Sequence, residues 1–271
     1  MALNYWTTSH QPKRNISPSR SVERFYRLQS NKSYLTLSLN QNCLIERTPS
    51  NQFRENSDLP KIIAKSILSA LALLKPEFNG IHTDINPNNV FLNLTEPSPV
   101  VKVGDLGNML REGYKTIRLQ CLPCRAPDVW RGLGCCYPSD AWSVGVTLAH
   151  WLSPYNIFGA QDKTIQGFTK AWCIAKIRRL VGPLDPPVNS DYEEEFWLGE
   201  QLESTTFVHP DTNLERPFIQ VGTVHQELEK LPGPKISPEL LDFIDYLLVV
   251  DHTKRPTALE ALQHPYLQSL L

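Results

Sequence analysis

The chain has 271 residues, with 27 Lys and Arg against 28 Asp and Glu, and a formal net charge of −1 at pH 7. This length fits one large domain or two small ones, and a composition of 41% hydrophobic and 20% charged residues excludes a disordered protein. The balanced charge excludes a global attraction to nucleic acid or to an anionic membrane, so the composition carries no direct nucleic-acid signal.

The apolar runs of the chain are too short for a membrane helix, which needs about 18 uninterrupted apolar residues. Lys65 and Ser66 interrupt the most apolar run, residues 62–74, and the first twenty residues have no apolar core like that of a secretory signal. The six cysteines are therefore expected to be reduced thiols, as in intracellular compartments. We expect a cytoplasmic or nuclear protein with no membrane partner.

The first part of the chain is polar. Residues 1–33 are rich in Ser, Asn and Arg and have no apolar periodicity, so we expect a disordered segment. Residues 34–39 and 43–46 have the composition of two short strands. Pro60 then opens a predicted helix, as proline commonly does in a first turn. The apolar positions of this helix recur at three- and four-residue steps until the region ends at Gly80.

The rest of the chain is predicted to be mainly helical around a small β insert. Two apolar runs, residues 90–94 and 100–103, flank a turn-prone TEPSP segment and predict a hairpin or a pair of short strands. The proline-rich stretch 184–235 is predicted to be a loop with an acidic run at residues 193–195. Apolar periodicity and Gly-Pro boundaries predict helices over residues 139–152, 165–181, 238–250 and 257–262.

The loop before the predicted hairpin concentrates polar side chains. Residues 82–90, HTDINPNNV, place an acid, a histidine and several amides between a helix and the hairpin. Reactive side chains are commonly found on such loops because a rigid scaffold holds them. Asn89 and Asp105 offer hard oxygen ligands that suit Mg²⁺ held jointly with a phosphate chain. Asp84 would then be free to orient a hydroxyl and accept its proton.

Three segments in this region resemble motifs of the protein-kinase family. The loop at residues 82–90 resembles the catalytic loop H-R-D-L-K-P-x-N, and Asp105-Leu106-Gly107 resembles D-F-G. Ala126-Pro127-Asp128 resembles the A-P-E that closes the activation segment of these enzymes.

Two further motifs follow in the family's order. Residues 139–145, SDAWSVG, are similar to the D-x-W-S-x-G of the central kinase helix. Arg255 is similar to the late family arginine, which would pair with Asp128. Five motifs in the right order and spacing argue against a chance match.

The resemblance implies an α+β fold over residues 34–271. This would be a protein-kinase-like, mainly α C-terminal lobe that carries a short β remnant of the N-terminal lobe. The implied activity is serine/threonine kinase activity, the transfer of the γ-phosphate of ATP to Ser or Thr of a protein. ATP and Mg²⁺ are the implied cofactors.

The resemblance also implies roles for the polar residues of the loops. Asp84 would be the catalytic base, while Asn89 and Asp105 would bind the metal and, through it, the nucleotide. His82 would support the loop backbone, and Asp140 would accept hydrogen bonds from backbone N–H groups of the catalytic loop. The alternative is that Asp84, Asn89 and Asp105 are polar residues that only keep the loops folded.

Variations within the motifs resemble the SR-protein kinases and their fungal relatives. The catalytic loop reads H-T-D-I and is followed by D-L-G-N, and a long insert precedes the final helices. Thr83 replaces the arginine that reads an activation-loop phosphate in many kinases, which implies an activation loop that orders without phosphorylation. The implied partner is a protein, in this branch an Arg/Ser-rich one. Lys176, Arg178, Arg179 and the acidic residues 193–195 would form either solvent-exposed surface or a docking groove for such a partner.

Three departures from the family's pattern predict weak or absent activity. The first glycine is Gly80, so no Gly-rich loop precedes it, and no V-A-I-K-like segment supplies a strand lysine. Asn86 stands where the family has the catalytic-loop lysine. An amide cannot neutralise charge on the γ-phosphate, and such stabilisation is worth roughly 3 kcal/mol. The alternatives are a non-catalytic pseudokinase binding module and an incomplete gene model of an active kinase.

The cysteines also raise the possibility of zinc. Cys121 and Cys124 have the two-residue spacer of structural zinc sites, but Cys135 and Cys136 are adjacent. The sequence therefore predicts no zinc site.

Overall fold

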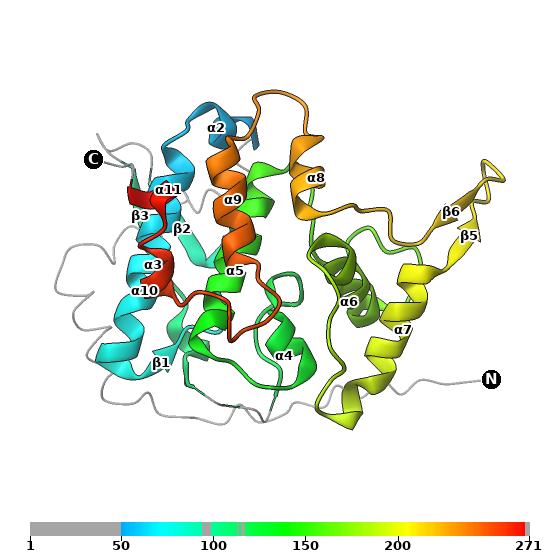
Figure 1. Cartoon of the computed structure of the whole chain (residues 1–271), viewed down its shortest axis with the longest axis horizontal. Coiled ribbons are helices and arrows are strands. Elements are labelled where there is room, and N and C mark those ends of the chain that lie inside the picture. The colour runs from blue at the N-terminus through cyan, green and yellow to red at the C-terminus, as the bar shows by residue number, and fades with distance from the viewer. Residues whose placement is uncertain (1–49, 94–98, 113, 115–116, 269–271) are drawn as a thin grey trace, which may run out of the picture. The chain divides into compact units, whose positions relative to one another are not determined.

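Residues 50–93, 99–112, 114 and 117–268 are described by the computed structural model of the chain (Figure 1). They belong to one unit, Gln41–Leu271. The predicted disordered segment 1–33 and the predicted strands 34–39 and 43–46 lie outside the described residues.

Helices dominate this unit, and its strands are short, so the predicted α+β class with a mainly helical lobe is confirmed. The helices are α2 (Ser50–Glu55), α3 (Leu59–Phe78), α4 (Pro127–Arg131), α5 (Tyr137–Leu152), α6 (Thr169–Leu180), α7 (Glu193–Ser204), α8 (Val224–Glu229), α9 (Pro238–Leu247), α10 (Ala258–Ala261) and α11 (Pro265–Gln268). The strands are β1 (Gly80–Ile81), β2 (Val90–Asn93), β3 (Val100–Val103), β4 (Leu110–Arg111), β5 (Thr206–Val208) and β6 (Glu215–Pro217). Across the described ranges, no helix has the length and apolarity that a membrane crossing requires.

Helix α5 lies at the centre of the core, with α3, α9 and α10 packed against it (Figure 1). Every residue from Ser139 to Ala149 is buried, as the all-round apolar pattern predicted. Gly145 permits the close approach of the segment after α9, because a Cβ at this position would lie 2.9 Å from Cδ2 of Leu248. The helix begins at Tyr137, two residues earlier than predicted, because the hydroxyl of Ser139 accepts the backbone N–H of Cys136 (2.9 Å) and caps the first turn.

The helix predicted after Pro60 is confirmed as α3. Pro60 lies in its first turn, and the buried positions follow the predicted three- and four-residue steps from Ile63 to Leu74. The helix ends at Phe78 because Asn79 adopts a left-handed conformation (φ 49°), in which its N–H reaches the carbonyls of the last turn.

Two pairs of short antiparallel strands flank the polar loops. The predicted hairpin is confirmed as β2–β3, with Val90 opposite Val103. The pair β1–β4, which the sequence did not reveal, joins Gly80 and Ile81 to Arg111 and Leu110. As a result, the loop after β1 and the loop after β3 are fixed at both ends and lie next to each other.

The helix predicted over residues 165–181 is shorter in the structure. Helix α6 begins at Thr169, and Phe168 before it has φ −93° and ψ 25°, outside helical geometry. Gly167 adopts φ +83°, which interrupts any helix at that point. The apolar periodicity across residues 165–168 was therefore misleading.

The prediction of a loop over residues 184–235 is wrong. The stretch contains α7, α8 and the β5–β6 hairpin. Helix α7 packs closely on α6 at Gly199, where a Cβ would lie 2.9 Å from Cγ2 of Ile174. Phe196 and Leu202 are buried on the same face. The acidic run Glu193–Glu195 forms the first turn of α7, where the positive end of the helix dipole favours carboxylates.

The prediction that Lys176, Arg178 and Arg179 share a solvent-exposed face is correct only for Arg179, which is exposed. Lys176 is 2% exposed, and its Nζ lies 3.1 Å from both carboxylate oxygens of Asp162. Arg178 is partly buried and contacts Glu203 on α7. Both cations have carboxylate partners from other parts of the chain, which a helical periodicity cannot reveal.

The last two predicted helices are confirmed with narrower bounds. Helix α9 covers Pro238–Leu247 and α10 covers Ala258–Ala261. Ser237 and Thr257 cap them by accepting backbone N–H groups with their hydroxyls. Leu248 departs from helical geometry, which ends α9 before Val250.

The predicted ion pair between Asp128 and Arg255 is confirmed and fully buried. Nη1 of Arg255 lies 2.8 Å from Oδ1 of Asp128, and the two side chains are 0% and 1% exposed. Arg255 also donates to the carbonyls of Val249 (2.7 Å) and Val250 (3.0 Å), while Ser139 donates to Asp128. The pair therefore joins α4, the start of α5 and the segment after α9.

Replacing Arg255 by alanine should lower the free energy of unfolding by roughly 3–5 kcal/mol, because it leaves the carboxylate of Asp128 buried without a cation. Urea unfolding of the 271-residue chain measures this change. Lys254→Ala is the matched control, since this neighbouring side chain is 78% exposed and should matter little. Equal unfolding midpoints for the two variants would contradict the assignment.

Candidate active site

The loop at residues 82–89 is anchored by a carboxylate from the central helix. Asp140 on α5 is 4% exposed. Its Oδ2 accepts the backbone N–H of His82 (2.8 Å) and its Oδ1 accepts that of Thr83 (3.0 Å), which confirms the predicted role of Asp140. Burial raises the pKa of the Asp140 carboxyl to about 7, against the opposing effect of the two N–H donors. The contact fixes a turn in which Thr83 adopts φ +64°.

His82 supports the backbone of both loops, as predicted. The ring is fully buried; its Nδ1 accepts the N–H of Asp84 (3.3 Å), and its Nε2 lies 3.0 Å from the carbonyl oxygen of Gly104. Since Nδ1 accepts, Nε2 carries the proton and donates to Gly104. Burial lowers the pKa of the ring, which favours this neutral form. Both nitrogens are engaged, so His82 positions the loops and has no free nitrogen for catalysis.

Asp84 is held between two amides. Nδ2 of Asn86 lies 3.0 Å from Oδ1 of Asp84, and Nδ2 of Asn89 lies 3.0 Å from Oδ2. The same amides donate to the carbonyl oxygen of Asp84 at 3.0 and 2.8 Å. These four contacts fix the orientation of a carboxylate that is still partly exposed.

Asn86 is committed to contacts within the loop. It is 7% exposed, and its Oδ1 accepts the backbone N–H of Asn88 (2.9 Å), which caps the 3₁₀ turn Pro87–Asn89. Its amide nitrogen already donates to Asp84. Both ends of this side chain are therefore occupied by the loop itself.

Asn89 and Asp105 come together at the open end of the β2–β3 hairpin. The backbone N–H of Gly104, the residue before Asp105, donates to the carbonyl of Asn89 (2.9 Å). Because the amide nitrogen of Asn89 is bound to Asp84, its Oδ1 faces away and accepts no hydrogen bond from the described residues. Asp105 is exposed with φ +58°, and its Oδ1 accepts the N–H of Gly107 (3.3 Å).

This donor set fits Mg²⁺. One carboxylate and one amide oxygen are hard ligands, and Mg²⁺ commonly takes only one or two side chains together with phosphate oxygens and water. Among the residues that the structure describes, His, Cys, Asp and Glu form no cluster of three or more that could hold a metal by themselves. Asn89 and Asp105 would therefore hold the ion only jointly with a phosphate-bearing ligand.

One contact at the site was missed from the sequence. The hydroxyl of Thr83 donates to the carbonyl oxygen of Asn108 (2.7 Å), which ties the loop of Asp84 to the loop that follows Asp105. The sequence shows a hydroxyl next to a predicted catalytic acid, but its partner is 25 residues away. No local pattern identifies that partner.

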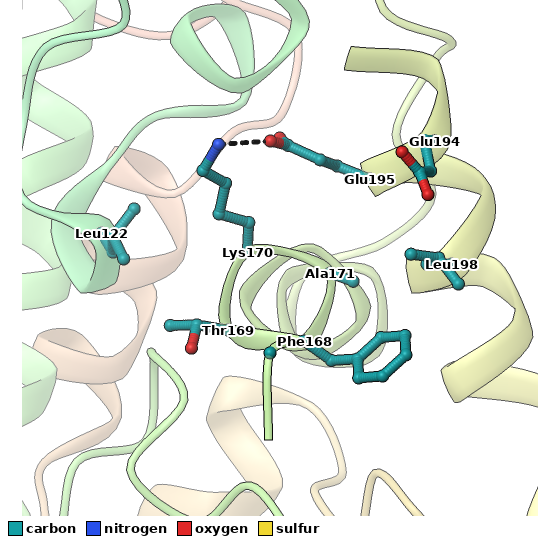
Figure 2. Close-up of a pocket in the computed structure, with 9 residues that line it drawn as sticks. Leu122, Phe168, Thr169, Lys170, Ala171, Glu194, Glu195 and Leu198 are labelled. Atoms are coloured by element: carbon teal, nitrogen blue, oxygen red, sulfur yellow. Dashed lines mark hydrogen bonds and ion pairs between the residues drawn. The ribbon is translucent and has the colours of Figure 1, made fainter. Parts of the chain in front are cut away.

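A pocket lies beside the segment that precedes α4. An open pocket of about 430 Å³ is lined by Leu122 of that segment, Lys170 of α6, and Glu194 and Glu195 of α7 (Figure 2). Lys170 and Glu195 form an ion pair across it, and Glu195 also binds Arg118. Two residues of the acidic run thus line the pocket from the first turn of α7, so of the two alternatives that the sequence left open, the loop is excluded.

Comparison with known proteins finds similarity to protein kinases, the family that the sequence motifs resemble. A sequence model described as "Protein kinase domain" matches residues 15–267. The "DYRK-family kinase pom1" of Schizosaccharomyces pombe is 29% identical over 230 residues, which is 83% of this chain and 19% of that protein. "Serine/threonine-protein kinase D3" of Homo sapiens is 28% identical over 220 residues, 79% of this chain and 19% of that protein.

A plant protein extends the comparison. "Serine/threonine-protein kinase AFC2" of Arabidopsis thaliana is 24% identical over 238 residues, 77% of this chain and 53% of that protein. The chain thus spans between about a fifth and about half the length of these relatives.

The role of Asp140 as an anchor can be tested by Asp140→Asn, which keeps the shape of the side chain. One of the two backbone N–H groups then faces an amide NH₂ and loses its acceptor, so the free energy of unfolding should fall by about 1–3 kcal/mol. Asp211→Asn, at a carboxylate that is 88% exposed, is the control. Thermal unfolding that is unchanged in Asp140→Asn would show that the loop does not depend on this carboxylate.

Proposed function

The chain belongs to the protein kinase domain family, and from this premise we propose that it binds ATP with Mg²⁺ and transfers the γ-phosphate to Ser or Thr of a protein partner. The observation that carries the proposal is the carboxylate of Asp84. It is oriented by Asn86 and Asn89, remains partly exposed, and belongs to a loop adjoining that of Asp105. That arrangement supplies one base and one metal-binding pair.

In this proposal Asp84 orients the attacking hydroxyl and accepts its proton. Each of its two oxygens receives one hydrogen bond from an amide, which leaves lone pairs on both for the incoming hydroxyl. The amides of Asn86 and Asn89 stabilise the carboxylate and restrict its rotation. Positioning of this kind is a large part of the catalysis of phosphoryl transfer.

Asn89 and Asp105 would hold Mg²⁺ with the oxygens that the described residues leave free. The bound ion supplies positive charge against the phosphates. The chain's own contribution is to aim the two ligands: the contact between Asn89 and Asp84 turns Oδ1 of Asn89 outward, and the turn at Gly107 holds Asp105 in its left-handed conformation.

Asn86 limits the rate that the site is expected to reach. A lysine at this position would bring a positive charge to the transferred phosphate, whereas the amide is neutral and already bound to Asp84 and Asn88. We expect slow transfer for this reason. The same observation favours a second candidate function, a non-catalytic binding module in which the amides only keep the loop folded.

Residues 117–126, which lead into α4, are held in place by contacts within the chain, which supports a substrate platform that needs no phosphate. Arg125 donates to the carbonyls of Leu119 (2.8 Å) and Gln120 (2.9 Å), and its guanidinium lies 4.6 Å from the ring centre of Trp130. Thr83 adds the contact to Asn108. We propose that this part of the activation segment is ordered without phosphorylation.

The pocket beside that segment supports a basic protein partner. Glu194 is exposed at its rim, while the charge of Glu195 is balanced by Lys170 and Arg118. The carboxylate of Glu194 lies near the apolar Leu198, one turn later on α7 (Figure 2). This arrangement suits an arginine-containing peptide, because a guanidinium binds carboxylates with two parallel hydrogen bonds. An Arg/Ser-rich protein is thus the partner class that we propose.

Nucleotide binding can be measured by the thermal unfolding of the chain with and without ATP and Mg²⁺. ATP at about 100 times its dissociation constant should add roughly 2.7 kcal/mol of stability, and chelation of Mg²⁺ should remove most of it. Asp105→Asn should lose the Mg²⁺-dependent part, whereas Asp211→Asn should keep it. A shift of equal size in Asp105→Asn and the unchanged chain would overturn the assignment of Asp105.

The limit set by Asn86 predicts a gain of function. In a chain that binds ATP, Asn86→Lys should raise the rate of phosphate transfer to an Arg/Ser-rich peptide by about a hundredfold, the usual size of one electrostatic contact. Asn88→Lys is the matched control, because this exposed neighbour adds the same charge away from Asp84. Binding of ATP without transfer in either variant would support the non-catalytic module instead.

A further inference from the structure

Two cysteines lie at the two ends of a single turn in the segment that precedes α4. Cys121 precedes the 3₁₀ turn Leu122–Cys124, and the N–H of Cys124 donates to the carbonyl of Cys121 (3.0 Å). The first and last Cα atoms of such a turn are less than about 7 Å apart, and disulfides span about 4.4–6.8 Å. We propose that Cys121 and Cys124 form an oxidation-sensitive thiol pair that a peroxide converts to a disulfide.

The two thiols differ in the way that this chemistry requires. Cys121 is partly exposed, and a hydrogen bond from the Cys124 thiol lowers its pKa. Cys124 is 1% exposed, and the same contact together with burial raises its pKa well above the ordinary value. Cys121 is therefore the more accessible and more readily ionised thiol, which a peroxide would oxidise first, and Cys124 is the resolving thiol.

The other described cysteines are not suited to this reaction. Burial raises the pKa of Cys135, Cys136 and Cys173 to about 12 in each case. At neutral pH these groups remain thiols, and a buried thiol reacts slowly with a peroxide in the first step. The difference makes oxidation selective for the pair in the turn.

The reaction is balanced with a peroxide as the oxidant. The thiolate of Cys121 attacks one oxygen of hydrogen peroxide, the O–O bond breaks, hydroxide leaves, and Cys121 becomes a sulfenic acid. The sulfur of Cys124 then attacks the sulfur of Cys121 and gives up its proton, and the departing hydroxide leaves as water. A dithiol reductant returns both residues to thiols by exchange.

The disulfide would form in the wall of the pocket. Leu122 lies between the two cysteines in sequence and lines the pocket with Lys170 (Figure 2). The carbonyl of Cys124 accepts the hydroxyl of Ser143 on α5 (2.8 Å), so this end of the turn is fixed to the core. Formation of the bond therefore acts mainly on Cys121 and Leu122. Oxidation of this turn does not require that the chain transfers phosphate.

Peptide mass spectrometry tests the proposal directly. Cleavage after Arg118 and Arg125 releases LQCLPCR, residues 119–125, which contains these two cysteines and no other. After treatment of the folded chain with hydrogen peroxide, this peptide should lose two hydrogen atoms and regain them with dithiothreitol. The peptide 171–176, which carries Cys173, should keep its free thiol and serves as the internal control.

Two variants separate the roles of the cysteines. Cys121→Ser, at a partly exposed position, should leave Cys124 as a free thiol under the same treatment. Cys124→Ala should trap the sulfenic acid on Cys121, where dimedone labels it, and its thermal unfolding shows whether the variant is folded. A peptide 119–125 that keeps its full mass, or equal oxidation of Cys173, would overturn the proposal, and so would oxidation of Cys124 in Cys121→Ser.

Discussion

The arrangement of the site depends on one buried carboxylate. Asp140 extends from the central helix and accepts two successive N–H groups of the loop at residues 82–89. That contact sets the left-handed turn at Thr83, from which His82 reaches the carbonyl of Gly104 and thereby fixes the start of the loop of Asp105. Because α5 is buried along most of its length, these contacts with Asp140 and His82 hold both polar loops in fixed positions.

Sequence was informative where a local signal or a family motif existed. The first turn of α3 at Pro60, the β2–β3 hairpin, the role of Asp140 and the pairing of Asp128 with Arg255 were all predicted. Helix α7 was missed because its stability comes from packing on α6 at Gly199, and prolines around it indicate a loop. The chemical roles of Asp84, Asn86, Asn89 and Asp105 stay predictions, since geometry alone does not measure turnover.

Other contacts could not be predicted because their partners are distant in sequence. Lys176 is buried by Asp162 from the preceding loop, and Thr83 reaches Asn108 across the site. Helical periodicity shows which face of α6 is apolar. It cannot show that a lysine on that face forms an ion pair with a carboxylate from another segment. In the same way, the pair β1–β4 is too short to produce an alternating pattern that a reader of the sequence would notice.

The pair of Asp128 and Arg255 has a consequence for synthesis. The two residues are 127 positions apart, and a ribosome adds roughly 5–20 residues per second. Asp128 emerges many seconds before its cation exists, so the junction of α4 and α5 cannot close around it while the chain is still growing. The helical unit therefore cannot complete its fold before Arg255 has been synthesised, and until then the carboxylate of Asp128 has no cation to pair with.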